Sequence, residues 1–302
     1  MISATEAKKG VAYGLSAYLL WGFLPVYFKL LAEVLPTEVV AQRILWSVVL
    51  LAGLILTTRR WPELRAAFAN PRALKLLTGS AILIAINWLI YIWAINANHV
   101  LEGSLGYFLN PLVNVIMGVL ILKERLTKAQ GVAVGLAGIG VAVLAIGAAS
   151  GLWISIALAL SFATYGLIRK VAPVDSLEGL TMETMLLAPF AAGYLFWLWS
   201  ADALRFGSEL NVSVLLILGG AVTATPLLLF AAAARRLQYS TLGLLQYIAP
   251  TIQFLLAIFL FGEPLTTAHL ICFAFIWSGL AVYAVDGLRR AARPLSAAPS
   301  RA

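Results

Sequence analysis

The chain has 302 residues, of which 62% are hydrophobic and only 11% are charged, and its mean hydropathy is +0.95. This composition excludes a soluble globular protein, because too few charged residues remain to cover its surface. The formal net charge of +8 arises from Lys and Arg in short clusters between apolar segments. Such clusters argue against nucleic-acid binding and predict an integral membrane protein whose surroundings are a lipid bilayer.

Ten apolar segments follow one another along the chain. A hydrocarbon core of about 30 Å needs about 20 helical residues, and each segment is about that long. The first is too long for a signal peptide and has no cleavage site, so we expect it to remain as a helix. The connections are short. We therefore predict an all-α integral membrane fold with ten transmembrane helices, at residues 10–31, 37–57, 74–95, 103–122, 129–147, 151–169, 179–200, 212–233, 240–261 and 267–287.

The distribution of Lys and Arg between the segments predicts the orientation. With a cytoplasmic N-terminus, eighteen Lys and Arg residues lie inside, and only Lys29 and Arg205 lie outside. Cytoplasmic connections carry the excess of positive charge in membrane proteins. The prediction is a multi-pass protein of the inner (plasma) membrane with both termini cytoplasmic, and with residues 289–302 as a flexible basic tail.

The two halves of the chain share one pattern. Shifting the sequence by 139 residues places Pro111 on Pro250 and Glu124 on Glu263, and each glutamate is followed after one residue by Leu-Thr. The shared register extends over more than fifty residues. A sequence that repeats in this way predicts an internal structural duplication.

Each copy contains five predicted helices, in residues 8–147 and 151–288. Because five is odd, the second copy must cross the membrane in the opposite sense, which puts Glu124 inside and Glu263 outside. Inverted repeats are typical of alternating-access transporters, whose substrate site lies near the midplane between the halves.

Polar side chains lie within two of the predicted helices. In the fourth helix, Tyr107, Asn110, Pro111 and Asn114 follow the spacing of one helical face. A polar face in a membrane points at water or at another helix. This stripe therefore either contacts substrate or joins helices through hydrogen bonds. The candidate cavity residues are Trp21, Asn87, Trp88, Tyr91, Tyr107, Asn110, Asn114, Gln246 and Tyr247.

Several segments together resemble one known family. They are WGFLPVYFK in the first helix, NWLIYIWAIN in the third, LEGSLGYFLNPLVN in the fourth and KERLT after it. They look like the EamA family of the drug/metabolite transporter superfamily, in its RarD-type (chloramphenicol-sensitive protein) branch, over residues 8 to 290.

The resemblance implies two inverted five-helix halves and a central cavity lined mainly by helices one to four and six to nine. It also implies export or exchange of small metabolites or drugs. The second half departs from the family motif, because Gln246 to Ala249 precede Pro250 where Asn110 directly precedes Pro111.

Charged residues and prolines within the predicted helices or at their ends are candidates for gating or coupling. They are Pro25, Lys29, Arg43, Glu102, Pro111, Glu183 and Pro250. Arg43 and Glu183 occupy matching places in the two copies, each roughly 8 to 9 Å from opposite surfaces and hence too far apart to pair. The expected partners are Glu38 and Glu102 for Arg43, and Arg169 and Lys170 for Glu183. These contacts are either two structural pairs or an outer and an inner gate, with Glu183 as a proton carrier.

No cofactor or metal is predicted. The sequence has no phosphate-binding loop and no soluble domain for ATP chemistry, one cysteine at Cys272, and two histidines, His99 and His269, far apart in the chain. We therefore expect a secondary transporter of a small-molecule substrate and not an enzyme. The alternatives are an intramembrane enzyme acting on an amphiphile, and a scaffold. The substrate, the direction, the coupling ion and the oligomeric state are not specified by the sequence.

Overall fold

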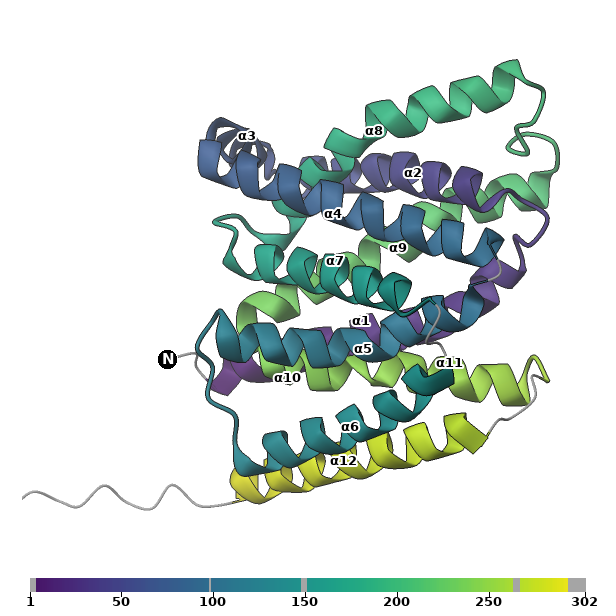
Figure 1. Cartoon of the computed structure of the whole chain (residues 1–302). Helices are drawn as coiled ribbons and strands as arrows, with labels where there is room; N and C mark the ends of the chain where they lie inside the picture. Colours follow the sequence, from purple (N-terminus) through teal and green to yellow (C-terminus); the bar gives the residue numbers. More distant parts are fainter. Residues whose placement is uncertain (1–3, 98, 148–150, 263–266, 293–302) are drawn as a thin grey trace, which may run out of the picture.

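The computed structural model describes residues 4–97, 99–147, 151–262 and 267–292, and the secondary structure of these residues is entirely helical (Figure 1). The helices are α1 (Ala4–Lys29), α2 (Pro36–Thr57), α3 (Trp61–Ala69), α4 (Pro71–Asn96), α5 (Val100–Leu120), α6 (Lys128–Gly147), α7 (Leu152–Val171), α8 (Ser176–Ser200), α9 (Leu210–Arg236), α10 (Tyr239–Gln246), α11 (Ile248–Phe259) and α12 (Thr267–Ala292).

Nine helical segments of the described chain are long and apolar enough to cross a membrane, and α10 and α11 together form one of them. The chain is therefore a multi-pass membrane protein. Helix α8 has 25 residues but is not among the nine. Glu178 and Glu183 lie in its first half and lower the hydropathy there.

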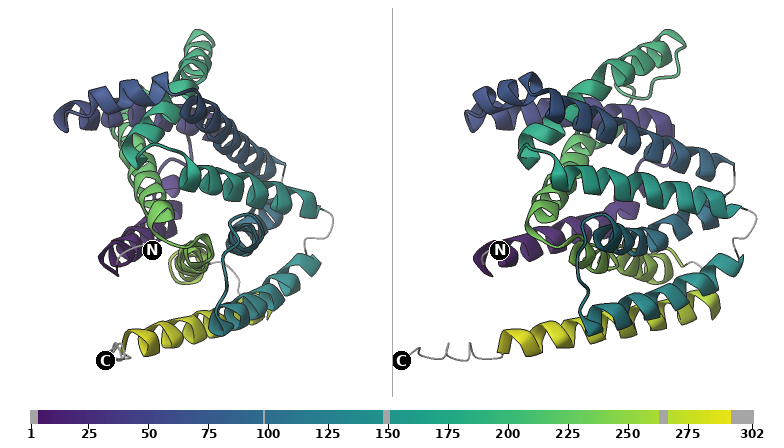
Figure 2. Two further views of the ribbon diagram at one scale, coloured as in Figure 1. Left: turned by 90° about the vertical axis from the view of Figure 1, so that its left-hand side faces the viewer. Right: turned by 60° about the vertical axis from the view of Figure 1, so that its left-hand side comes forward.

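The long helices run side by side and alternate in direction (Figures 1 and 2). Helices α1, α4 and α8 begin at the end of the bundle where α2, α5, α7 and α9 finish. We call this the basic end, because the segments there carry most of the described Lys and Arg residues. They include Arg59, Arg60, Lys123, Arg125, Arg169, Lys170, Arg235 and Arg236.

The main helix contacts join the first half of the chain to the second. Helix α1 packs against α9 and α11, α2 against α8 and α9, α4 against α7, and α5 against α7 and α10. Helices α6 and α12 pack on each other at the edge of the bundle (Figure 1). Their backbones approach closely at two glycines: a Cβ on Gly140 would lie 2.7 Å from the Cys272 carbonyl oxygen, and one on Gly279 would lie 2.8 Å from that of Ala133. Small residues permit such close approach in membranes.

The structure differs from the expected helices at two places. The connection after residue 57 contains α3, whose Leu64 and Ala67 are buried on its inner face. The helix expected over residues 240–261 is interrupted at Tyr247. The Tyr247 N–H donates to the carbonyl of Leu244, three residues back instead of four, at 3.4 Å. Pro250 lacks an N–H and clashes with the preceding turn, which explains an interruption there.

Two of the expectations reach residues outside the described ranges. Glu263 is one of these residues, so the position predicted for it is not observed. Helix α12 continues to Ala292, so the predicted flexible tail is helical at its start, and its remaining residues, 293–302, also lie outside.

Candidate substrate cavity

A cavity of about 170 Å³ lies between the two halves of the chain. Its lining residues occupy the second halves of α1 and α4 and the first halves of α2 and α5, so it extends from the middle of the bundle away from the basic end. The lining residues are Tyr18, Trp21, Leu24, Pro25, Phe28, Val40, Arg43, Ile84, Asn87, Trp88, Tyr91, Ile92, Tyr107, Asn110, Phe162, Thr223, Leu227, Gln246, Ala249, Pro250 and Gln253.

Most of the candidate residues meet at this cavity. Those that line it are Trp21, Pro25, Arg43, Asn87, Trp88, Tyr91, Tyr107, Asn110, Gln246 and Pro250. Those that do not are Lys29, Glu102, Pro111, Asn114, Glu183 and Tyr247. Two polar lining residues, Thr223 and Gln253, were not predicted, although each stands three residues from a proline within an apolar helix. Helix α8, the seventh segment, contributes no lining residue within the described chain.

Asn110 and Asn114 lie one turn apart on α5 but have different surroundings. Asn114 is fully buried, and its amide donates a hydrogen bond to the Gln246 side-chain oxygen at 2.6 Å, which joins α5 to α10. Asn110 is 2% exposed and lines the cavity, and its side-chain oxygen has no hydrogen-bond donor in the described structure. The side-chain oxygen of Asn114 also lacks a donor in the described structure, but Asn114 does not line the cavity. Asn114 therefore holds two helices together, whereas Asn110 offers an unused acceptor to the cavity.

We expect Asn110→Leu and Asn114→Leu to have separate effects. Asn114→Leu removes an interhelical hydrogen bond and should lower stability by on the order of 1 kcal/mol, as measured by thermal unfolding in detergent. Asn110→Leu breaks no bond of this kind and should leave the unfolding temperature within about a degree while it reduces substrate flux. Equal losses of stability in the two variants would contradict this division.

A second polar contact at the cavity satisfies a carbonyl that a proline leaves free. Pro25 has no N–H, so the carbonyl of Trp21, one turn earlier, loses its partner within the helix. Gln253 on α11 donates its side-chain N–H to this carbonyl at 3.0 Å. The other half of the chain thus satisfies the carbonyl that Pro25 releases in α1, as membrane helices require when a backbone group loses its partner.

Arg43 is the cation of the cavity wall. Its Nε donates to the Thr223 hydroxyl on α9 at 2.5 Å, and that hydroxyl donates to the Gly219 carbonyl at 2.7 Å. The guanidinium carbon lies 5.2 Å from the ring centre of Phe28 and 5.5 Å from that of Trp88. These contacts fix the guanidinium among aromatic faces that attract a cation.

The acids expected beside Arg43 have other partners, so that expectation is wrong. Glu38 accepts hydrogen bonds from the backbone N–H groups of Arg205 and Phe206 at 3.0 to 3.1 Å. Glu102 lies 3.5 Å from Nδ1 of His99. The connection between α8 and α9 presents unpaired backbone donors that reach Glu38 on α2, and backbone donors of this kind leave no signature in the sequence.

An aromatic layer separates the cavity from the basic end. We use this name for Tyr18, Trp21, Phe162, Tyr165 and Phe230, which come from α1, α7 and α9. Neighbouring ring centres lie 5.5 to 6.4 Å apart. Such spacing is that of packed aromatic pairs, so the bundle is filled at this level.

Beyond the aromatic layer lies a buried charged pair. Arg169 on α7 is 1% exposed and Glu183 on α8 is 2% exposed, and Nη1 of Arg169 lies 3.8 Å from the Glu183 carboxylate. Ser80 on α4 donates a hydrogen bond to the same carboxylate. Lys170 was also expected beside Glu183, but it donates instead to the backbone carbonyls of Ala234 and Leu237, because the end of α9 offers free acceptors there.

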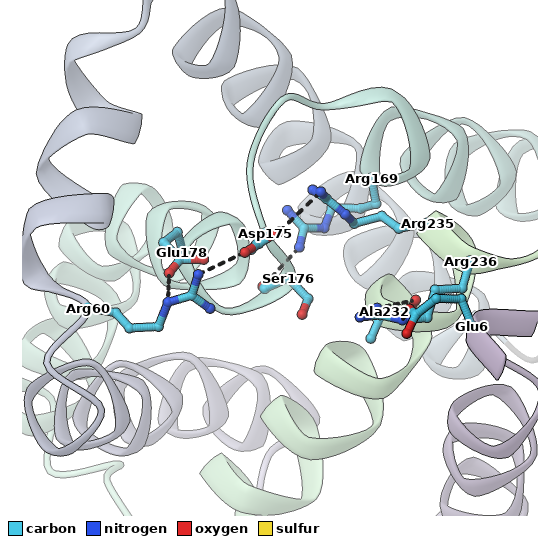
Figure 3. A network of polar contacts seen from close by, with 9 residues as sticks. All are labelled: Glu6, Arg60, Arg169, Asp175, Ser176, Glu178, Ala232, Arg235 and Arg236. Atoms are coloured by element: carbon cyan, nitrogen blue, oxygen red, sulfur yellow. Dashed lines mark hydrogen bonds and ion pairs between the residues drawn. The ribbon is translucent and has the colours of Figure 1, made fainter. Parts of the chain in front are cut away.

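Ion pairs close the basic end at its surface, and Figure 3 shows them. Arg60, between α2 and α3, donates a hydrogen bond to Asp175 at 2.7 Å, and its Nε lies 2.9 Å from the Glu178 carboxylate in an ion pair. Asp175 also contacts Arg235 at 3.1 Å. The hydrogen bond from Arg60 lowers the pKa of Asp175 below 3.8, and the charge of Arg235 adds to this effect. The network thus joins the first half of the chain to α8 and α9.

The remaining candidates lie in packed or peripheral positions. Tyr247 is buried beside α12 and donates its hydroxyl to the Phe108 carbonyl at 3.3 Å. The Lys29 ammonium lies 4.4 Å from the ring centre of Phe261. The Pro111 carbonyl oxygen would lie 2.7 Å from a Cβ at Gly243, so α5 and α10 cross closely at this point. These residues position the helices around the cavity.

Comparison with known proteins identifies the family. Residues 8–146 match the model of the EamA-like transporter family. Protein RarD of Escherichia coli (strain K12) is 43% identical over 288 residues, which cover 95% of this chain and 97% of that protein. The chain belongs to the EamA-like transporter family. Within the EamA family it is of the RarD type, as the segments quoted from the sequence predict.

Other relatives match over nearly the whole chain. An uncharacterized transporter of Vibrio cholerae is 48% identical, and the match covers 94% of both chains. The chloramphenicol-sensitive protein RarD of Pseudomonas aeruginosa is 35% identical, over 93% of this chain and 95% of that protein. One protein of known crystal structure superposes with a TM-score of 0.73 over 93% of this chain and 99% of the other, at 19% identity. That likeness shows the fold alone.

Proposed function

We propose that this chain is a secondary transporter that exports or exchanges small metabolites or drugs by alternating access. The observation that carries the proposal is the cavity, because its wall combines α1, α2, α4 and α5 with α7, α9, α10 and α11. A site shared by two halves changes its access when one half rocks against the other. The relatives named as transporters support this reading.

We further propose that the chain has ten spans in two inverted halves. Helix α8, the seventh segment in chain order, is then a span in addition to the nine helical segments named above. The helix contacts support this arrangement when each helix of the first half is matched with one of the second. The matches are α1 with α7, α2 with α8, α4 with α9, α5 with the α10–α11 segment, and α6 with α12. The pairing exchanges the α1–α9 contact with the α7–α4 contact, and it exchanges α1–α11 with α7–α5. It also relates Glu38, which binds the α8–α9 connection, to Glu178, which binds Arg60.

The proposed gates lie at the two ends of the bundle. The aromatic layer, the Arg169–Glu183 pair and the Arg60 network form the gate at the basic end. Glu38, with the backbone donors of the α8–α9 connection, belongs to the opposite gate. Pro25 and Pro250 are proposed hinges, because each interrupts helix hydrogen bonding at the cavity wall. Glu183 is the proposed proton carrier when its side opens.

For the cellular setting, we propose the inner membrane with both termini in the cytoplasm. The excess of Lys and Arg at the basic end supports this orientation through the positive-inside rule. The basic end is then cytoplasmic, and the cavity faces outward.

A flux assay with purified protein in liposomes tests the proposal. Vesicles that contain the protein should take up a labelled substrate faster than empty vesicles, with saturation, and excess unlabelled compound should accelerate efflux by exchange. The compounds to screen are metabolites whose external level changes in cells that overproduce the protein. Product formation without flux would instead favour an intramembrane enzyme, and neither result would favour a scaffold.

A further inference from the structure

The cavity wall carries a net positive charge. Among the described residues that line it, Arg43 is the only cation and no Asp or Glu is present. In the described chain Arg43 has a hydroxyl, Thr223, as its hydrogen-bond partner and no carboxylate within ion-pair distance. A cation inside a membrane protein is costly unless an opposite charge or water compensates it.

The side-chain amides of the wall other than Asn110 have hydrogen-bond partners within the protein. Asn87 donates to the Leu158 carbonyl and the Ser161 hydroxyl, both at 2.9 Å. Gln246 accepts from Asn114, and Gln253 donates to the Trp21 carbonyl. The Asn110 oxygen is buried and has no donor in the described structure. A buried acceptor without a donor is unfavourable, so a ligand that supplies an N–H or O–H would stabilise this wall.

The rest of the wall is apolar and rich in aromatic rings, and the cavity is small. The aromatic rings that line the same cavity as Arg43 and Asn110 belong to Tyr18, Trp21, Phe28, Trp88, Tyr91, Tyr107 and Phe162. The cavity volume of about 170 Å³ is close to the roughly 150 Å³ of a cavity that holds one benzene ring. The space therefore suits one ring or a short branched chain.

From these three observations we propose that the cavity binds a small organic anion. Its carboxylate lies on the guanidinium of Arg43, its ring or branched chain packs among the aromatic side chains, and an N–H or O–H of the ligand donates to Asn110. A planar guanidinium recognises a carboxylate through two parallel hydrogen bonds. This inference rests on the proposed role of the cavity as the substrate site.

Four phenyl compounds of similar size test the proposal by titration against the purified full chain. 3-Phenyllactate carries a carboxylate and a hydroxyl donor, and 3-phenylpropionate lacks the hydroxyl. Phenylalanine adds an ammonium group, and 3-phenylpropylamine has no carboxylate. Binding is measured by calorimetry and by the intrinsic tryptophan fluorescence, to which Trp21 and Trp88 of the cavity wall contribute. We expect 3-phenyllactate to bind most tightly and 3-phenylpropylamine most weakly.

Variants separate the two polar contacts. Arg43→Met should weaken the binding of both anions by at least about tenfold, because a charge-assisted pair is lost. Asn110→Leu should weaken 3-phenyllactate to the level of 3-phenylpropionate and leave 3-phenylpropionate unchanged. Arg72→Met removes an exposed arginine at the basic end and is the matched control. Circular dichroism and thermal unfolding establish that each variant is folded.

The outcomes distinguish this proposal from the transport function. Equal binding of the amine and the anions, or full anion binding by folded Arg43→Met, would overturn the anion proposal. Saturable flux of other compounds without binding of either anion would also overturn it and leave the transporter standing. Tight, Arg43-dependent anion binding without flux in liposomes would support the anion site and contradict transport.

Discussion

Glu183→Leu is expected to destabilise the protein by about 3–5 kcal/mol, because it leaves the buried Arg169 guanidinium without its carboxylate. Among the described residues, Glu183 is the single acid that lies within ion-pair distance of Arg169. An arginine does not lose its proton in proteins, so the stranded charge cannot be neutralised. The remaining contact of Arg169, to the Ser176 carbonyl at 3.0 Å, carries no full negative charge.

Removal of Arg169 instead of Glu183 should destabilise the protein less. In Arg169→Met the carboxylate of Glu183 can bind a proton and keep its hydrogen bond with Ser80, so we expect a loss of about 1–3 kcal/mol. The double variant Arg169→Met with Glu183→Leu removes both charges and should unfold near the wild-type temperature.

Unfolding in detergent, followed by temperature and by denaturant, measures all three variants. Glu63→Leu, an exposed acid on α3, is the control and should change stability by less than about 0.5 kcal/mol. A double variant as unstable as Glu183→Leu alone would show that the two charges do not compensate each other.

Arg60→Glu is expected to shift the bundle toward a conformation that is open at the basic end. The substitution replaces two attractive contacts, to Asp175 and Glu178, with two repulsive ones. The Arg60–Asp175 contact is partly exposed, and contacts of this kind contribute about 0.2–1 kcal/mol each. The Glu178 carboxylate is buried, so its contact with Arg60 contributes at least as much. The changes together correspond to a shift of the equilibrium of at least about tenfold. Substrate exchange should slow, because the basic end no longer closes fully.

Pulsed spin-label distances can detect this opening. Labels at Ala66 on α3 and Val171 at the end of α7 are both exposed and flank the network. Arg60→Glu should add a population at longer distance, whereas Arg65→Glu, an exposed residue on α3, should not. An unchanged distance distribution in Arg60→Glu would show that the ion pairs do not hold the gate.

The pH dependence of this network follows from the pKa of Asp175, which Arg60 lowers from its ordinary value of 3.8. For an acid whose folded pKa is depressed, the stabilisation is present above the unfolded pKa and is lost as pH falls through the folded pKa. The contact is thus complete at every pH above about 4. A dependence of flux on pH near neutrality would therefore have to come from another group.

The membrane helices and the family could be predicted from the sequence, because hydropathy, charge bias and a motif set are properties of contiguous residues. Helix α3 could not, because its nine residues lie in a connection that hydropathy does not mark as a helix. The interruption at Tyr247 could not either, although Pro250 stands in the sequence. Pro25 and Pro111 leave α1 and α5 continuous, so a proline alone does not predict a break in a membrane helix.

The cavity was predictable by region and not by residue. Asn110 and Asn114 lie on one helical face, and only the packing of α10 decides which of them meets Gln246, 132 residues after Asn114. The predicted partners of Arg43 were wrong because the prediction assumed an acid beside every buried cation. In the fold, the Thr223 hydroxyl is the group that Arg43 reaches. Side-chain partners that are far apart in the chain require the fold.

The pairing of α6 with α12 gives the molecule a frame of reference. Neither helix contributes a lining residue within the described chain, and their contact at Gly140 and Gly279 leaves no room to slide. The distance across this pair should therefore be the same at every stage of the transport cycle. Optical or magnetic probes placed on it would form an internal ruler, against which the displacement of every other helix can be calibrated in the same molecule.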